Sequence, residues 1–123
     1  MIDSDQMVAA IKTHCKALSA KDKDLWLSIW AEDAVLEDPV GRDIFRGRKE
    51  LGTKFWNSIE SLSPMKLWLE RDTIVCGNEA IAFLNGVVTL NGKLHGVGPN
   101  LTDHFVFNED GKINSMRAFW KYT

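Results

Sequence analysis

The spacing of the apolar residues changes at Pro64 from a helical to an extended pattern, and this change constrains the fold most. Before Pro64, apolar side chains recur every three or four residues over 5–20, from about 22, and over 47–62, which predicts three helices. The second of these helices is expected to bury Leu25, Trp26, Ile29 and Trp30. After it, the sequence predicts strands within 65–75, 79–90, 93–108 and 112–121. Helices followed by consecutive strands indicate an α+β fold.

Turn signals connect these predicted strands. Asn91-Gly92 is the strongest hairpin signal in the sequence, and Asp110-Gly111 marks a second turn. A further short strand is predicted over 34–38, where Pro39 ends it. We expect an antiparallel, bent sheet with the helices on one face, and a single domain over 1–123, since 123 residues suffice for one core.

Composition and charge argue against several classes of function. The net charge is −2 with both signs interspersed, so neither nucleic acid nor an anionic membrane is an expected partner. No apolar stretch approaches the roughly 20 residues of a membrane span, and no signal-peptide pattern is seen. We therefore expect a cytoplasmic protein in which Cys15 and Cys76 are free thiols. The histidines lack metal-ligand spacing and Gly96-Val97-Gly98 lacks the third glycine of a dinucleotide loop, so no metal or organic cofactor is expected.

Asp103 stands on the apolar face of a predicted strand. It alternates with Leu101, Phe105 and Phe107, whereas His104 falls on the opposite face. A carboxylate among such side chains must find a partner or stay protonated. This pattern alone leaves open whether Asp103 is a functional group or a structural acid that hydrogen-bonds to the sheet.

Two further polar residues occupy constrained positions. Asp38 precedes Pro39, which holds its backbone extended and fixes the direction of its side chain, although an acid here can also cap a turn. The neighbouring Glu37 is expected to be solvated surface charge. His14 lies on the apolar stripe of the first predicted helix, where a polar residue usually has a partner.

Two segments resemble the bacterial ketosteroid isomerase family. These are residues 31–41, AEDAVLEDPVG, followed by Arg46-Gly47, and residues 103–108, DHFVFN, followed by GKI at 111–113 and SMRA at 115–118. The similarity extends over nearly the whole chain and is loose between 52 and 99. It implies the cone-shaped fold of the nuclear transport factor 2-like, or SnoaL-like, superfamily, with three helices packed on a strongly curved antiparallel sheet. It also implies a homodimer and a deep pocket for a small, flat hydrophobic ketone such as a steroid.

The resemblance assigns a role to each acid. Asp38 would be the general base that moves a proton between two carbons of a β,γ-unsaturated ketone, and Asp103 would be a neutral acid that donates a hydrogen bond to the dienolate oxygen. The pocket walls would be Val40, Phe55, Met116 and Trp120, although plain core packing is an equal explanation for each of them. The implied activity is that of a steroid delta-isomerase-like enzyme without a cofactor.

His14 departs from the family pattern, which has a tyrosine at the matching position as the second donor to the oxyanion. A neutral His14 could donate an N–H to the same oxygen. Alternatively, His14 could form an ion pair with Asp103 and support another acid–base reaction, such as dehydration, polyketide cyclisation or epoxide hydrolysis. As a third possibility, His14 is a core histidine of a non-catalytic protein that binds hydrophobic ligands.

Overall fold

The computed structural model describes residues 2–98 and 101–121. Its helices are α1 (Ser4–Ala20), α2 (Lys23–Leu27), α3 (Gly47–Glu50) and α4 (Trp56–Glu60), and a π-helical turn, η1 (Leu51–Phe55), joins the last two. Its strands are β1 (Trp30–Glu37), β2 (Ile44–Arg46), β3 (Met65–Leu69), β4 (Ile74–Cys76), β5 (Glu79–Leu90), β6 (Lys93–Gly96), β7 (Leu101–Phe107) and β8 (Ile113–Phe119). The predicted α+β class is confirmed.

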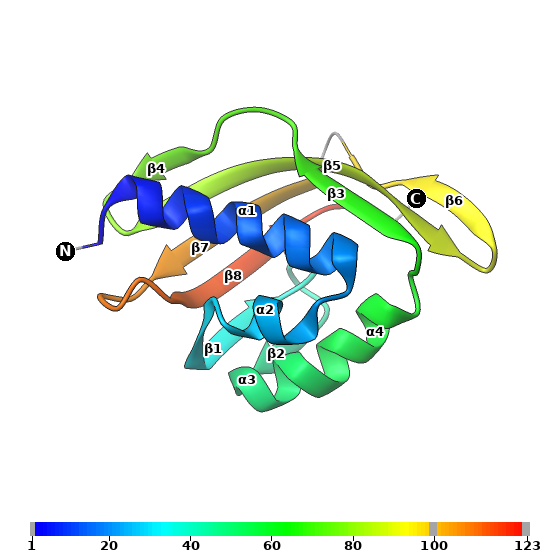
Figure 1. Cartoon of the computed structure of the whole chain (residues 1–123), viewed down its shortest axis with the longest axis horizontal. Coiled ribbons are helices and arrows are strands. Elements are labelled where there is room, and N and C mark those ends of the chain that lie inside the picture. Colours follow the sequence, from blue (N-terminus) through cyan, green and yellow to red (C-terminus); the bar gives the residue numbers. More distant parts are fainter. Residues whose placement is uncertain (1, 99–100, 122–123) are drawn as a thin grey trace.

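The strands form one curved, unclosed sheet in the order β2-β1-β8-β7-β5-β3, and β4 and β6 pair with the two ends of β5. Figure 1 shows α1 lying across one face of this sheet, with α2, α3 and α4 beside its β1 and β2 edge. All strand pairs are antiparallel except β1 with β8, which is parallel. The expectation of a wholly antiparallel sheet is therefore wrong at this pair. Strands far apart in sequence can pair in parallel because a long connection joins them.

The first helix has the sequence signals of a stable start. Asp3 accepts a hydrogen bond from the backbone N–H of Gln6 (2.8 Å), and the Gln6 side chain accepts one from the backbone N–H of Asp3, which completes a capping box. The predicted apolar stripe is buried against the sheet, and it includes His14. The first functional candidate is thus held on a long, well-capped helix.

The second predicted helix is shorter than its apolar pattern suggested. Asp22 caps it, as expected, by accepting from the N–H of Leu25 (3.1 Å), but the helix ends at Leu27. Trp30 was expected to be helical and instead begins β1, where it pairs with Ile113 of β8. Backbone pairing with the sheet overrides a helical spacing that covers only two turns.

Gly86 and the Asn91-Gly92 turn shape the sheet in different ways. At Gly86 of β5, an added Cβ would lie 2.2 Å from the backbone oxygen of Lys66, so glycine permits the close approach of β3. Asn91 and Gly92 have φ values of 53° and 76°, which confirms the predicted tight hairpin between β5 and β6.

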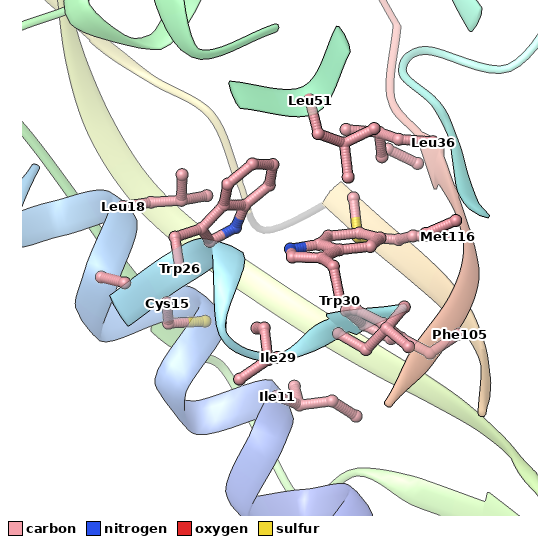
Figure 2. Packing of buried hydrophobic residues seen from close by; sticks show 14 of the residues in the cluster. Ile11, Cys15, Leu18, Trp26, Ile29, Trp30, Leu36, Leu51, Phe105 and Met116 are labelled. Atoms are coloured by element: carbon pink, nitrogen blue, oxygen red, sulfur yellow. The ribbon is translucent and has the colours of Figure 1, made fainter. Parts of the chain in front are cut away.

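The core lies between the inner face of the sheet and the helices α1, α2, η1 and α4. Figure 2 shows Trp26 and Trp30 side by side in it, with Ile11 and Cys15 from α1 on one side and Phe105 and Met116 from the strands on the other. The ring centroids of Trp26 and Trp30 are 5.1 Å apart. Within the described residues, no helix is long and apolar enough to cross a membrane.

Candidate functional site

Asp103 and His14 meet in the core beneath α1. Asp103 lies in the middle of β7, and its strand neighbours are Ala82 of β5 and Ala118 of β8, both buried. These small side chains leave the space above the strand to the carboxyl group and the imidazole. Both polar residues are 2% exposed, and 3.7 Å separates His14 Nε2 from Asp103 Oδ2. The two groups face one another, but this distance is too long for a hydrogen bond.

A hydrogen bond from Trp26 fixes the proton of His14. The indole Nε1–H of Trp26 donates to His14 Nδ1 at 3.0 Å within the core. A nitrogen that accepts a hydrogen bond carries no proton, so the N–H of the neutral ring is on Nε2, which faces Asp103. Burial also lowers the pKa of His14 to about 4, which favours the neutral ring at pH 7.

Two effects favour the neutral form of Asp103. Its burial raises its pKa well above the usual range, and the negative charge of Asp38 raises it further. Asp103 Oδ1 is buried without a hydrogen-bond partner among the described residues. Both effects favour a protonated carboxyl group, and one of its oxygens is buried without a hydrogen bond.

The geometry disfavours an ion pair between His14 and Asp103. The separation of 3.7 Å is short enough for an ion pair. However, an imidazolium carries protons on both nitrogens, and Trp26 could not then donate to Nδ1. The pKa shifts of both groups, caused mainly by burial, also favour their neutral forms. We call His14, Asp103 and Trp26 the buried end of the site.

Asp38 and Trp120 form the outer end of the site. Asp38 directly follows β1, and its backbone N–H donates to the oxygen of Asp43 at 2.9 Å. The indole Nε1–H of Trp120 donates to Asp38 Oδ1 at 2.6 Å. Burial raises the pKa of Asp38, the Trp120 hydrogen bond opposes this rise, and the charge of Asp43 adds to it. Asp38 is half-buried, so it has access to solvent that Asp103 lacks.

The turn that carries Asp38 is held by a residue whose role the sequence did not reveal. Glu37 Oε2 accepts from the backbone N–H of Gly41 (2.9 Å), and Glu37 Oε1 accepts from Nε of Arg117 (3.0 Å). These two bonds hold the pKa of Glu37 below its usual range. The expectation that Glu37 is only solvated charge is wrong, because its carboxylate ties the turn to β8.

The four predicted wall residues divide between the two ends. Phe55 and Met116 are buried in the core, and the Phe55 ring stacks on Trp26 with centroids 5.1 Å apart. Val40 and Trp120 are half-buried near Asp38, where the Val40 N–H donates to the Ala118 oxygen at 2.9 Å. Contact with a ligand remains a prediction for all four.

Two hollows in the described surface lie away from the acids. One, of about 430 Å³, is lined by Val8, Lys12, Leu69, Arg71, Asp72 and Thr73. The other, of about 440 Å³, is lined by Lys16, Ser19, Ala20, Met65, Lys66 and Leu67. Neither includes a predicted site residue, so the apolar pocket at the acids also remains a prediction.

Sequence reasoning missed the polar role of Trp26, which was expected only as a buried apolar residue. The sequence held part of the signal, because a buried indole N–H needs an acceptor and His14 is a polar residue on an apolar stripe, but it does not show that the two helices pack together. The expected orientation of His104 is confirmed: it faces away from Asp103, and its Nε2 lies 2.7 Å from Glu79 Oε1. Over 2–98 and 101–121, no group of three or more His, Cys, Asp or Glu side chains is arranged to hold a metal ion.

The chain is similar to known proteins over most of its length. The model of the SnoaL-like domain matches residues 11–116. A steroid Delta-isomerase of Nocardioides simplex is 32% identical over 117 residues, which cover 95% of this chain and 91% of that protein.

Solved structures show the same fold at lower identity. Rv0760c of Mycobacterium tuberculosis in complex with estradiol-17beta-hemisuccinate has a TM-score of 0.82 and 21% identity, over 94% of each chain. The epoxide hydrolase/cyclase-like enzyme SalBIII has a TM-score of 0.85 and 24% identity, over 98% of this chain and 95% of its own. SalBIII has a role in pyran ring formation in the polyether salinomycin. A computationally designed 17-OHP binder has a TM-score of 0.82 and 21% identity, over 94% of this chain and 93% of its own.

Proposed function

Because the chain belongs to the SnoaL-like domain family, we propose that it is a cofactor-independent enzyme that isomerises a β,γ-unsaturated ketone. The observation that carries the proposal is the pairing of two neutral donors, His14 Nε2–H and protonated Asp103, in a buried site. Asp38 supplies a carboxylate near enough to raise the pKa of Asp103 by its charge. The 32% identity to a steroid Delta-isomerase supports the same reaction class.

The reaction needs one base and a stabilised oxyanion. Asp38 removes the proton from the carbon between the carbonyl and the double bond, and the electron pair moves onto the carbonyl oxygen to give a dienolate. Since Trp120 donates a hydrogen bond to Oδ1 of Asp38, we assign Oδ2 as the oxygen that takes the proton. Asp38 then returns this proton to the γ-carbon, which yields the conjugated ketone. The product is an isomer of the substrate, and nothing is oxidised or reduced.

The buried end would stabilise the dienolate oxygen. His14 Nε2–H and the Asp103 O–H would both donate to it, and neither group bears a charge that must be neutralised first. Donors fixed in a site without water are worth more than the same donors in water. The orphaned Asp103 Oδ1 supports this role, because it leaves the carboxyl without a protein partner that would hold its proton.

The proposed substrate is a small, flat hydrophobic ketone such as a steroid. Its walls would come from Val40, Phe55, Met116 and Trp120. Two proteins of the same fold have steroid-type ligands: Rv0760c forms a complex with estradiol-17beta-hemisuccinate, and the designed protein is a 17-OHP binder. These ligands support the substrate class.

Turnover of a Δ5-3-ketosteroid, followed by the absorbance of the conjugated enone, tests the proposal. We expect turnover by the wild type and a loss of about 10²- to 10⁴-fold in Asp38→Asn, which keeps the shape of the side chain and removes the base. Asp33→Asn, an exposed acid on β1, is the matched control and should keep wild-type turnover. Ligand binding without turnover in the wild type would exclude an isomerase and indicate a binding protein.

A second candidate uses the same acids for epoxide opening. A protonated Asp103 with a free oxygen could donate its proton to an epoxide oxygen while Asp38 deprotonates an attacking hydroxyl or water. The epoxide hydrolase/cyclase-like neighbour, with a TM-score of 0.85, has a compatible fold. Product from a hydrophobic hydroxy-epoxide but none from the ketosteroid would favour this reaction.

We also propose a homodimer that forms through the sheet face opposite α1. The strand register places Trp68, Phe83 and Phe119 on this face, and Trp68 and Phe119 are 40% and 42% exposed. Exposed aromatic side chains gathered on one sheet face are typical of protein interfaces. Sedimentation equilibrium should give twice the chain mass, and Phe119→Glu should shift the protein to the monomer. A monomeric wild type would exclude the dimer.

A further inference from the structure

Trp26 and Trp30 present two similar indoles to His14, but only one of them bonds to it. Each indole centroid lies 6.3 Å from the imidazole centroid, and both tryptophans are buried. Figure 2 shows their nitrogens turned toward one another. The Trp26 N–H donates to His14 Nδ1, whereas the Trp30 N–H has no hydrogen-bond partner among the described residues. The core therefore contains a matched pair that differs in one hydrogen bond.

We propose that Trp26 is a positioning residue that keeps the N–H of His14 on Nε2, the nitrogen that faces Asp103. Trp26 would not contact the substrate, since its N–H donates to Nδ1, the imidazole nitrogen that does not face Asp103. Trp26 acts through the imidazole ring. While Nδ1 accepts the hydrogen bond from Trp26, Nδ1 cannot carry a proton, whereas the other neutral tautomer and the imidazolium both have a proton on Nδ1. The role of this tautomer in turnover rests on the function proposed above.

The alternative states of His14 show what Trp26 prevents. In the other neutral tautomer, Nε2 would be an acceptor and could take a hydrogen bond from protonated Asp103, so that both donors would be lost to a ligand. In the imidazolium, His14 would form an ion pair with Asp103 at the present 3.7 Å separation. The hydrogen bond from Trp26 thus keeps both neutral donors available to a ligand. Without it, His14 and Asp103 would be bound to each other.

The surroundings of His14 contain few other groups that could fix its proton. Asp103 of β7 is the titratable group that faces the ring, and the charge of Asp38 raises the pKa of Asp103. Cys15 follows His14 on α1, and burial raises the pKa of its thiol to about 12, so it stays neutral. The remaining described ring contacts, Trp30 of β1 and Phe105 of β7, are edge-on and offer no acceptor.

Nitrogen NMR of the ligand-free protein tests the inference without any turnover. In ¹⁵N-labelled wild type, Nδ1 of His14 should have the shift of an unprotonated nitrogen, and a coupling across the hydrogen bond should link it to Nε1 of Trp26. In Trp26→Phe, this Nδ1 resonance should move toward that of a protonated nitrogen. In Trp30→Phe, which removes the same volume and an unbonded N–H, it should stay at the wild-type position. Equal shifts in both variants, or none in Trp26→Phe, would overturn the inference.

If Trp26→Phe does not fold, the coupling between His14 Nδ1 and Trp26 Nε1 in the wild type is the test. Absence of the coupling would exclude the hydrogen bond, and its presence would support the inference. Where turnover is measurable, Trp26→Phe should lower kcat by about 10- to 100-fold, within the range expected for losing one oxyanion donor. A wild type without isomerase activity but with the coupling and the shift in Trp26→Phe would refute the proposed reaction and retain the tautomer assignment. The two failures are therefore distinguishable.

Discussion

Each end of the site combines an indole N–H with a carboxyl group, and the two ends differ in burial. At the outer end, an indole N–H from Trp120 donates to the half-buried Asp38 at 2.6 Å. At the buried end, an indole N–H from Trp26 donates at 3.0 Å to His14 rather than to the acid, and Asp103 has one oxygen without a partner. The ionised form of Asp38 is thus stabilised by a donor, whereas that of Asp103 is not.

This difference shows how one residue type can supply both a base and an acid. Burial raises the pKa of each carboxyl, but at Asp38 a hydrogen bond opposes the rise, and at Asp103 the charge of Asp38 increases it. Two interacting carboxyls do not ionise together readily, so the better solvated one loses its proton first.

Asp103→Ala should have the largest effect on the buried end. Removal of the neutral acid leaves the dienolate with His14 alone, so turnover of the ketosteroid should fall by about 10²- to 10³-fold. Asp103→Asn keeps an N–H donor at the same place and should lose less. Steady-state kinetics should show the loss in kcat rather than in KM, and equal losses in the two variants would argue against a donor role.

The stability of the buried end should fall in acid because His14 is held neutral. Its pKa is lowered from 6.5 to about 4, so the unfolded chain binds the proton first as the pH falls. The stabilisation is therefore complete above pH 6.5 and is lost as the pH approaches 4, by roughly 3 kcal/mol in all. Urea unfolding of wild type and His14→Gln between pH 7 and 4 measures this difference. Parallel pH curves would contradict the burial of a neutral ring.

Asp103 should have the opposite linkage. Its pKa is raised in the folded state, so the folded protein holds a proton that the unfolded chain releases above about 3.8. Its contribution to stability is present below that pH and is lost as the pH rises. Asp103→Asn, which does not titrate, should therefore be more stable than wild type at pH 8, by about 1–2 kcal/mol. This gain should shrink at pH 5, and a gain that is equal at both pH values would exclude titration of Asp103 as its cause.

The sequence predicted the placement of the two carboxyls better than their hydrogen-bond partners, because local signals define the placement. Pro39 restricts the backbone of Asp38, and strand alternation predicted Asp103 on the face that is buried in the structure. The partner of His14 depended on where the second helix ended, and helical spacing misplaced Trp30 because its strand pairing is with Ile113, 83 positions later. The hydrogen bond from Trp26 likewise required the packing of α2 on α1, which a period of apolar residues does not encode.

Trp120→Phe should have the smallest effect and sharpens the comparison at the outer end. The variant removes the N–H that holds Asp38 Oδ1, and because this bond lowers the pKa of Asp38, its loss should raise that pKa. A smaller fraction of Asp38 is then ionised at a given pH, so the acidic limb of the pH–rate profile should move to higher pH. Turnover below that limb should fall about tenfold, in line with a hydrogen bond to a charged group. Trp56→Phe is the matched control, because its indole donates to Glu60 instead, and its profile should coincide with the wild type. An unshifted limb in Trp120→Phe would mean that Asp38 is not the base whose ionisation the profile reports.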